Sequence, residues 1–111
     1  MSTFASLDPQ VRPWAEWFVG LLREAGLNPI VTSSRRSAAT QRRLYADYLA
    51  GRNPYPVARP GTSRHELGQA FDMVVPYVEI IGPLWNRVIP GRTKWGGKAD
   101  PVHFELRLPR K

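Results

Sequence analysis

The chain has 111 residues, of which 42% are hydrophobic, and a net charge of +7. We expect a single domain over residues 1–111, because a chain of this length forms one compact unit that buries roughly two-thirds of its unfolded surface. It has no cysteine, which excludes disulfides, a thiolate nucleophile and cysteine zinc sites. The positive charge predicts attraction to polyanions such as nucleic acid, anionic lipid or an acidic cell wall.

Neither a secretory leader nor a membrane span is predicted. The stretch MSTFASLDPQ lacks a basic region followed by an apolar core. No stretch approaches the roughly 18 consecutive apolar residues that a membrane span requires. We therefore expect a protein that is made in the cytoplasm without a signal peptide and is not inserted into a membrane.

The chain begins with a predicted helix and a predicted strand. Asp8 is a candidate cap for a helix that starts at Pro9 and ends at Gly26. Apolar residues recur there at three- and four-residue steps, which predicts one buried face. That face comprises Val11, Trp14, Phe18, Leu21 and Ala25. Residues 28–34 predict a short strand, because Pro29 breaks the helix and β-branched residues follow it.

A second helix is predicted over residues 38–51, with Ser37 as its cap and Gly51 at its end. Its buried side is expected to hold Leu44, Tyr45, Tyr48 and Leu49. Residues 51–64 contain three prolines and two glycines, too many helix and strand breakers for regular structure. This segment is therefore expected to be a surface loop.

Residues 69–75, QAFDMVV, predict a strand with a carboxylate on one face. Asp72 shares that face with Ala70 and Val74, and the opposite face carries Phe71, Met73 and Val75. A carboxylate on a strand flanked by apolar residues needs a partner, because burying an unpaired charge costs several kcal/mol.

The last third of the chain predicts a helix, a turn-rich segment and a strand. Residues 78–89 predict a short or broken helix, and residues 93–101 are rich in turn residues. Residues 102–108 predict a strand with apolar side chains on one face and His103, Glu105 and Arg107 on the other. With helices mainly early and most strands late, the order favours an α+β domain.

Three side chains are candidates to bind a catalytic zinc ion. Such sites usually use three protein ligands at about 2.0–2.2 Å and leave a fourth position for water. His65 lies at a loop end, Asp72 on one predicted strand and His103 on another. If the two strands are neighbours, Asp72 and His103 can point to one position, and the small residues Gly68 and Ala70 let the chain fold back to bring His65 there.

Asp100 and Arg36 are candidates for catalytic roles. A carboxylate near a metal-bound water can accept its proton and pass it to a leaving amine. An arginine has several donors for the oxyanion that develops when a carbonyl is attacked. Other roles fit the spacing too: a structural histidine at position 103, an ordinary loop carboxylate at position 100, and a solvated or phosphate-binding Arg36. Spacing alone leaves these alternatives open.

Three ordered segments within residues 33–108 resemble the peptidase M15 family, the D-alanyl-D-alanine carboxypeptidases and L-alanyl-D-glutamate endopeptidases that trim peptidoglycan stem peptides. SRHELGQAFD and DPVHFEL resemble the two parts of its zinc signature, and SRRSAATQRRLY resembles a third family block. The matching residues are Arg36, Ser37, Gln41, Leu44, Tyr45, Ser63, His65, Gly68, Ala70, Asp72, Asp100 and His103.

This resemblance implies roles for individual residues. It implies that Zn²⁺ is the cofactor and that its ligands are His65, Asp72 and His103. It also implies that Asp100 is the general base and that Arg36 polarises the scissile carbonyl. Two further residues are assigned to the substrate-binding region: Ser63, as a substrate-contacting or loop-ordering hydroxyl, and Gln41, mainly as a residue that orders the loop of Arg36.

The resemblance further implies a small α+β domain with a central, largely antiparallel sheet, and a zinc-dependent peptidase that hydrolyses peptidoglycan stem peptides. WGGKADPVHFEL resembles the phage-type L-alanyl-D-glutamate endopeptidases, so we expect that bond to be cut by a phage or prophage lysis enzyme. We expect a monomer that reaches the bacterial cell wall through a membrane pore or from outside on a virion.

Three alternatives to this function remain. The first is D-alanyl-D-alanine carboxypeptidase activity, because the family includes both reactions. The second is a non-catalytic cell-wall-binding module of the same fold, although such a module has no chemical reason to keep the ligands together with Asp100 and Arg36. The third is a nucleic-acid-binding domain, which rests on the net charge and the arginines and lacks a known docking motif. We therefore expect no specific nucleic-acid partner.

Overall fold

The computed structural model describes residues 4–54 and 56–109. Its elements are α1 (Arg12–Glu24), β1 (Ile30–Ser33), α2 (Ala38–Leu49), β2 (Ala70–Val74), α3 (Val78–Asn86), β3 (Thr93–Trp95), the short 3-10 helix η1 (Gly97–Ala99) and β4 (His103–Leu106). The four strands form one antiparallel sheet in the order β1-β2-β4-β3. The predicted α+β class and antiparallel sheet are therefore confirmed.

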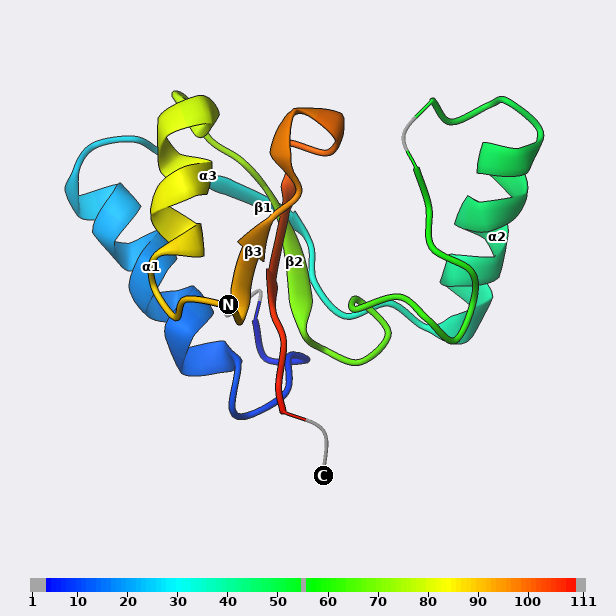
Figure 1. Cartoon of the computed structure of the whole chain (residues 1–111), viewed down its shortest axis with the longest axis horizontal. Helices are drawn as coiled ribbons and strands as arrows, with labels where there is room; N and C mark the ends of the chain where they lie inside the picture. Colours follow the sequence, from blue (N-terminus) through cyan, green and yellow to red (C-terminus); the bar gives the residue numbers. More distant parts are fainter. Residues whose placement is uncertain (1–3, 55, 110–111) are drawn as a thin grey trace.

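The hydrophobic core lies between the sheet and the pair of helices α1 and α3, which are next to each other in Figure 1. Phe71 of β2 stacks on Phe104 of β4, with ring centroids 5.5 Å apart. Trp85 of α3 packs against both rings and against Phe18 of α1. Burying each such side chain contributes about 1.5–3 kcal/mol, so this aromatic cluster fixes the two central strands against the helices.

Helix α1 begins later than predicted and buries a different face. It starts at Arg12, and Asp8 instead accepts a hydrogen bond from the Gln10 amide at 2.8 Å in the preceding turn. Trp14 and Leu21, predicted to be buried, are 40% and 43% exposed. The face toward the sheet holds Val11, Ala15, Phe18, Val19 and Leu22. Val11 and Phe18 are buried as predicted, but the prediction was wrong for Trp14, Leu21 and Ala25, because two apolar stripes share Val11 and Phe18 and only packing selects between them.

Helix α2 starts as predicted but lacks the predicted buried side. The Ser37 side chain accepts a hydrogen bond from the Thr40 amide at 3.1 Å, which confirms the cap. Leu44 and Tyr45 are half-buried, Tyr48 and Leu49 are 37% and 67% exposed, and the buried residue of this helix is Gln41. Figure 1 shows that α2 stands apart, on the other side of the sheet from α1 and α3, and no residue of Ala38–Leu49 belongs to the hydrophobic core cluster.

The sheet has an apolar face, which packs against the core, and an opposite face that carries polar side chains. Phe71, Met73 and Val75 point into the core as predicted, and so do Phe104 and Leu106 of β4. The turn-rich segment at residues 93–101 contains a short strand, β3, and the helix η1, neither of which was predicted. Among the described residues, no helix has the length and apolar character to cross a membrane.

Candidate active site

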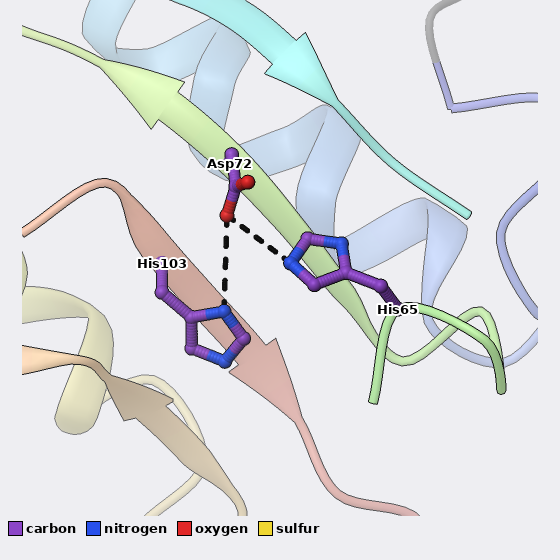
Figure 2. A group of neighbouring side chains, drawn as sticks. All are labelled: His65, Asp72 and His103. Carbon is purple, nitrogen blue, oxygen red and sulfur yellow. Dashed lines mark hydrogen bonds and ion pairs between the residues drawn. The ribbon is translucent and has the colours of Figure 1, made fainter. Parts of the chain in front are cut away.

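Two histidines and an aspartate from three segments meet on the polar face of the sheet (Figure 2). Oδ1 of Asp72 lies 3.1 Å from Nε2 of His65 and 3.8 Å from Nδ1 of His103. One potential ligand atom from each of the three residues lies within 4.8 Å of the other two. The structure thus brings together the three side chains that were predicted as metal ligands.

Sheet register and a glycine turn bring these residues together. Asp72 on β2 is the direct antiparallel partner of His103 on β4. The loop that carries His65 turns at Gly68, whose φ of +71° is a conformation that glycine adopts at little cost. A Cβ atom at Gly68 would lie 2.8 Å from the main-chain nitrogen of Asp8. A side chain at this position would therefore collide with the segment that precedes α1, a reason for glycine that the sequence did not reveal.

The main chain sets the orientation of the His65 ring. Nδ1 of His65 lies 2.7 Å from the main-chain carbonyl oxygen of Ser34, directly after β1. A carbonyl can only accept a hydrogen bond, so Nδ1 is the donor. The ring is 3% exposed, and its Nε2 atom is directed at Asp72. His65 therefore presents Nε2 to the centre of the cluster.

A carboxylate sets the orientation of the His103 ring. Nε2 of His103 is 2.8 Å from Oε1 of Glu105, which leaves Nδ1 on the side of Asp72. Burial alone would lower the pKa of His103, but the carboxylates of Asp72 and Glu105 outweigh it and raise this pKa to about 9. Without a metal ion, His103 is therefore protonated at neutral pH.

Asp72 is ionised and divides its two oxygens between different partners. Burial would raise the pKa of Asp72, but the imidazoles of His103 and His65 and the Arg36 guanidinium hold it well below its usual range. Oδ2 accepts a hydrogen bond from Arg36 at 2.8 Å, and Oδ1 faces the two imidazoles. The carboxylate thus keeps one oxygen directed at the cluster centre.

Arg36 lies beside this cluster, and Gln41 supports it. A second nitrogen of the guanidinium donates to Oε1 of Gln41 at 3.3 Å, and the Arg36 amide donates to the His65 carbonyl oxygen at 3.0 Å. Gln41 is 1% exposed and donates to the Ala58 carbonyl oxygen at 2.8 Å. These contacts agree with a loop-ordering role for Gln41.

Asp100 and Ser63 line the same pocket, which has a volume of about 450 Å³. Burial raises the pKa of Asp100, and the nearby negative charge of Asp72 raises it further against the opposing effect of the cationic groups. The Asp100 carbonyl oxygen accepts a hydrogen bond from the His103 amide at 3.1 Å. The Ser63 hydroxyl is buried and accepts one from the His65 amide at 3.2 Å, so it orders the loop that carries His65.

Glu105 is the residue that the sequence reasoning missed. It lines the pocket, is 7% exposed and contacts a candidate ligand. Burial would raise its pKa, but His103 and Arg107 lower the pKa of Glu105 to about 2. The alternation of side chains along β4 already placed Glu105 on the face of His103, and that was the signal available in the sequence.

The donor set fits a zinc ion. A tetrahedral ion with bonds of about 2.0–2.1 Å separates its ligand atoms by roughly 3.3 Å. The two separations that involve Oδ1 of Asp72, 3.1 Å and 3.8 Å, are close to that value, and the potential ligand atoms of all three residues lie within 4.8 Å of one another. Two imidazole nitrogens and one carboxylate oxygen are ligands typical of catalytic zinc. In each ring the other nitrogen donates a hydrogen bond to an oxygen atom, as is usual for histidines that bind a metal.

A His-Asp-His cluster with a neighbouring carboxylate and guanidinium in a pocket is an arrangement typical of metal-dependent hydrolases. The sequence model of the VanY family, described as D-alanyl-D-alanine carboxypeptidase, matches residues 5–87. The chain therefore belongs to this family, within peptidase M15. The match includes His65 and Asp72 and ends before Asp100 and His103, which the structure places beside them. No curated protein matches the chain.

Solved structures of peptidoglycan enzymes share the fold. A variant of the vancomycin-resistance D,D-pentapeptidase VanY in complex with Zn(II) is 22% identical, with a TM-score of 0.59 over 90% of this chain and 72% of its own. The L,D-carboxypeptidase DacB from Streptococcus pneumoniae is 22% identical, with a TM-score of 0.64 over 92% and 67%. The Serratia marcescens L-Ala D-Glu endopeptidase ChiX is 24% identical, with a TM-score of 0.64 over 94% and 83%.

Proposed function

We propose that this protein is a zinc-dependent peptidase that hydrolyses peptidoglycan stem peptides, with the bond between L-alanine and D-glutamate as its target. The observation that carries the proposal is the convergence of His65, Asp72 and His103, with potential ligand atoms within 4.8 Å of one another. Membership of a peptidase family supports the reaction class. The solved relative that contains Zn(II) supports the choice of metal.

The candidate ligands and Asp100 have distinct roles in the proposed reaction. A zinc ion held by Nε2 of His65, Oδ1 of Asp72 and Nδ1 of His103 would lower the pKa of a water ligand to about 7 and polarise a carbonyl group. Asp100 accepts the proton of the attacking water and delivers it to the leaving amine. In the metal-free protein, burial and the charge of Asp72 raise the pKa of Asp100, and a carboxyl in such surroundings readily holds a proton.

Arg36 stabilises the negative charge that develops on the carbonyl oxygen of the substrate. Its contacts with Asp72 and Gln41 fix the position of the guanidinium and use two of its five N–H donors. The remaining donors can bind an oxyanion without any rearrangement of the side chain. Gln41 and Ser63 hold the loops that carry Arg36 and His65, so they act on the substrate through these two residues.

The choice of bond rests on the segment that contains Trp95, Gly96, Gly97, Asp100 and His103, because it resembles the endopeptidase branch of the family. ChiX, an L-Ala D-Glu endopeptidase, matches over 83% of its own length. D-alanyl-D-alanine carboxypeptidase activity is the second candidate, because the family description names that reaction and VanYB binds D-alanine-D-alanine. The two activities release different products from the same stem peptide.

The proposal is tested by mass spectrometry of muropeptides. Purified muropeptides with intact stem peptides are incubated with the zinc-loaded protein, with and without a chelator. Cleavage after L-alanine is expected only in the metal-loaded sample, whereas loss of a terminal D-alanine would identify a carboxypeptidase. Unchanged masses with zinc bound would contradict catalysis and favour a non-catalytic wall-binding module.

We also propose that the protein acts on the bacterial cell wall. We propose further that it is a single domain, that it acts as a monomer and that it belongs to a phage or prophage lysis system. The net charge of +7 supports the location, because peptidoglycan and the polymers attached to it are acidic. Binding to isolated cell walls is expected to weaken as salt concentration rises. Sedimentation of the protein with walls at increasing salt measures this effect, and salt-independent binding would contradict a charge-driven attraction.

A further inference from the structure

We propose that Glu105 is a positioning residue that fixes the His103 ring so that Nδ1, and not Nε2, faces the metal. This inference rests on the proposed function, because it assumes that His103 is a zinc ligand. A histidine ring can rotate by half a turn about its bond to Cβ and present a different edge to the same position. A residue that determines which edge is presented therefore determines whether the ligand set is complete.

The contact between the two side chains is short and shielded from water. Oε1 of Glu105 lies 2.8 Å from Nε2 of His103, and the side chains of Glu105 and His103 are 9% and 17% exposed. An ionised carboxylate only accepts hydrogen bonds, so Nε2 of His103 carries the proton and donates it. Nδ1 is then the nitrogen that remains for a metal, on the side of Asp72.

Glu105 is itself held in place by other groups. Arg107 donates to Oε2, and Nε of Arg64 lies 4.0 Å from the same oxygen. The indole of Trp85 donates to the main-chain oxygen of Glu105 at 2.9 Å, which ties this point of β4 to α3. The carboxylate is thus anchored through its second oxygen and its main chain, which leaves Oε1 in a fixed position for His103.

The two histidines are oriented by different means. The acceptor for His65 is the main-chain oxygen of Ser34, which no substitution removes. The acceptor for His103 is a side chain, so it can be removed while the three ligands stay in place. Carboxylates that bind the second nitrogen of a metal-ligating histidine typically contribute about 10- to 100-fold to metal affinity.

The test measures zinc affinity of the full chain by competition with a chromophoric chelator. Glu105→Ala is expected to weaken zinc binding by about 10- to 100-fold. Glu105→Gln keeps an oxygen that can accept from Nε2, so it should recover part of this loss. Glu16→Ala, which removes an exposed carboxylate paired with Arg12 on α1, is the matched control and should bind zinc as tightly as the wild type.

A second readout identifies the bound nitrogen directly. In the cadmium-substituted protein with isotope-labelled imidazoles, NMR couplings should connect the metal to Nδ1 of His103 in the wild type and in Glu105→Gln. Unchanged zinc affinity in Glu105→Ala, or metal bound through Nε2 of His103 in the wild type, would overturn the inference. Failure of the wild type to bind zinc would instead overturn the proposed function, so the two failures are distinguishable.

Discussion

Asp72 and His103 face each other as direct partners on the antiparallel strands β2 and β4, with Oδ1 of one 3.8 Å from Nδ1 of the other. The geometry of the site is therefore set by the register of the sheet. A slip of one residue would turn one of these side chains toward the core face, where Phe71 and Phe104 stack. The aromatic core that fixes the register thus also fixes the distance between two candidate ligands.

Asp72→Asn tests the contribution of the carboxylate to metal binding. The amide keeps the size of the side chain but removes the charge that balances a cation and that pairs with Arg36. We expect zinc affinity to fall by more than about 100-fold, beyond the effect of losing a residue that only supports a ligand. Isothermal titration with zinc measures this. Asp47→Asn, at an exposed carboxylate paired with Arg52, should bind normally, and equal affinities for the two variants would contradict the assignment.

Asp100→Asn separates catalysis from metal binding. An amide cannot accept a proton from water at neutral pH, so the rate of hydrolysis should fall by about 100- to 10,000-fold while zinc content stays that of the wild type. Turnover of a purified stem peptide and metal analysis of the same sample give the two values. Asp8→Asn, outside the pocket, serves as the control. Undiminished turnover in Asp100→Asn would remove Asp100 from the mechanism.

Gly96→Ala tests the packing behind the site. A Cβ atom at this position would lie 2.3 Å from the Asp100 carbonyl oxygen and 3.1 Å from Cβ of His103, so the backbone of that segment would have to shift. We expect a loss of about 1–3 kcal/mol in the free energy of unfolding, together with weaker zinc binding. Urea denaturation followed by Trp fluorescence measures the stability.

Gly20→Ala is the matched control for this substitution. A Cβ atom at Gly20 would meet no atom within 4 Å, and the residue lies inside α1. Alanine there should raise the stability by up to about 1 kcal/mol through its higher helix propensity. If Gly96→Ala left the stability unchanged or raised it, as expected for Gly20→Ala, the proposed close packing at Gly96 would be wrong.

The stability of the metal-free protein should depend on the charge of His103. Its pKa rises from 6.5 to about 9 on folding, so its favourable contribution is complete below pH 6.5 and is lost as the pH rises through 9. The pKa of Glu105 falls from 4.5 to about 2 on folding, so its contribution is complete above pH 4.5 and is lost in acid. We expect stability to be highest between these limits and to decline from pH 6.5 to pH 9.

Denaturant unfolding of the metal-free protein across this range measures the decline. His103→Gln should remove most of it, because glutamine has no charge to lose. A wild-type stability that is constant between pH 6.5 and pH 9, or an equal decline in His103→Gln, would contradict the interpretation of the His103 environment.

The features that the sequence predicted correctly are the ones set by short-range rules. The cap at Ser37 depends on residues within one turn, and the two faces of β2 follow from strict alternation along the strand. Asp72 and His103 could be proposed as partners because each is a polar residue on a strand whose opposite face is apolar. The resemblance to a peptidase family then selected the metal site from several open alternatives.

The features that were missed depend on which elements pack together. Tyr48 and Leu49 form an apolar pattern on α2, but this helix lies away from the core and leaves them exposed. Strand β3 has only three residues and forms by pairing with β4, a contact that local composition does not reveal. The role of Glu105 depends on a side-chain orientation that alternation alone does not specify.

The most direct test of the central claim is anomalous diffraction at the zinc absorption edge from crystals of the zinc-loaded protein. We predict one zinc ion per chain, bonded to Nε2 of His65, Oδ1 of Asp72 and Nδ1 of His103. A zinc ion bound elsewhere, or no zinc between these three side chains at saturating concentration, would contradict this claim.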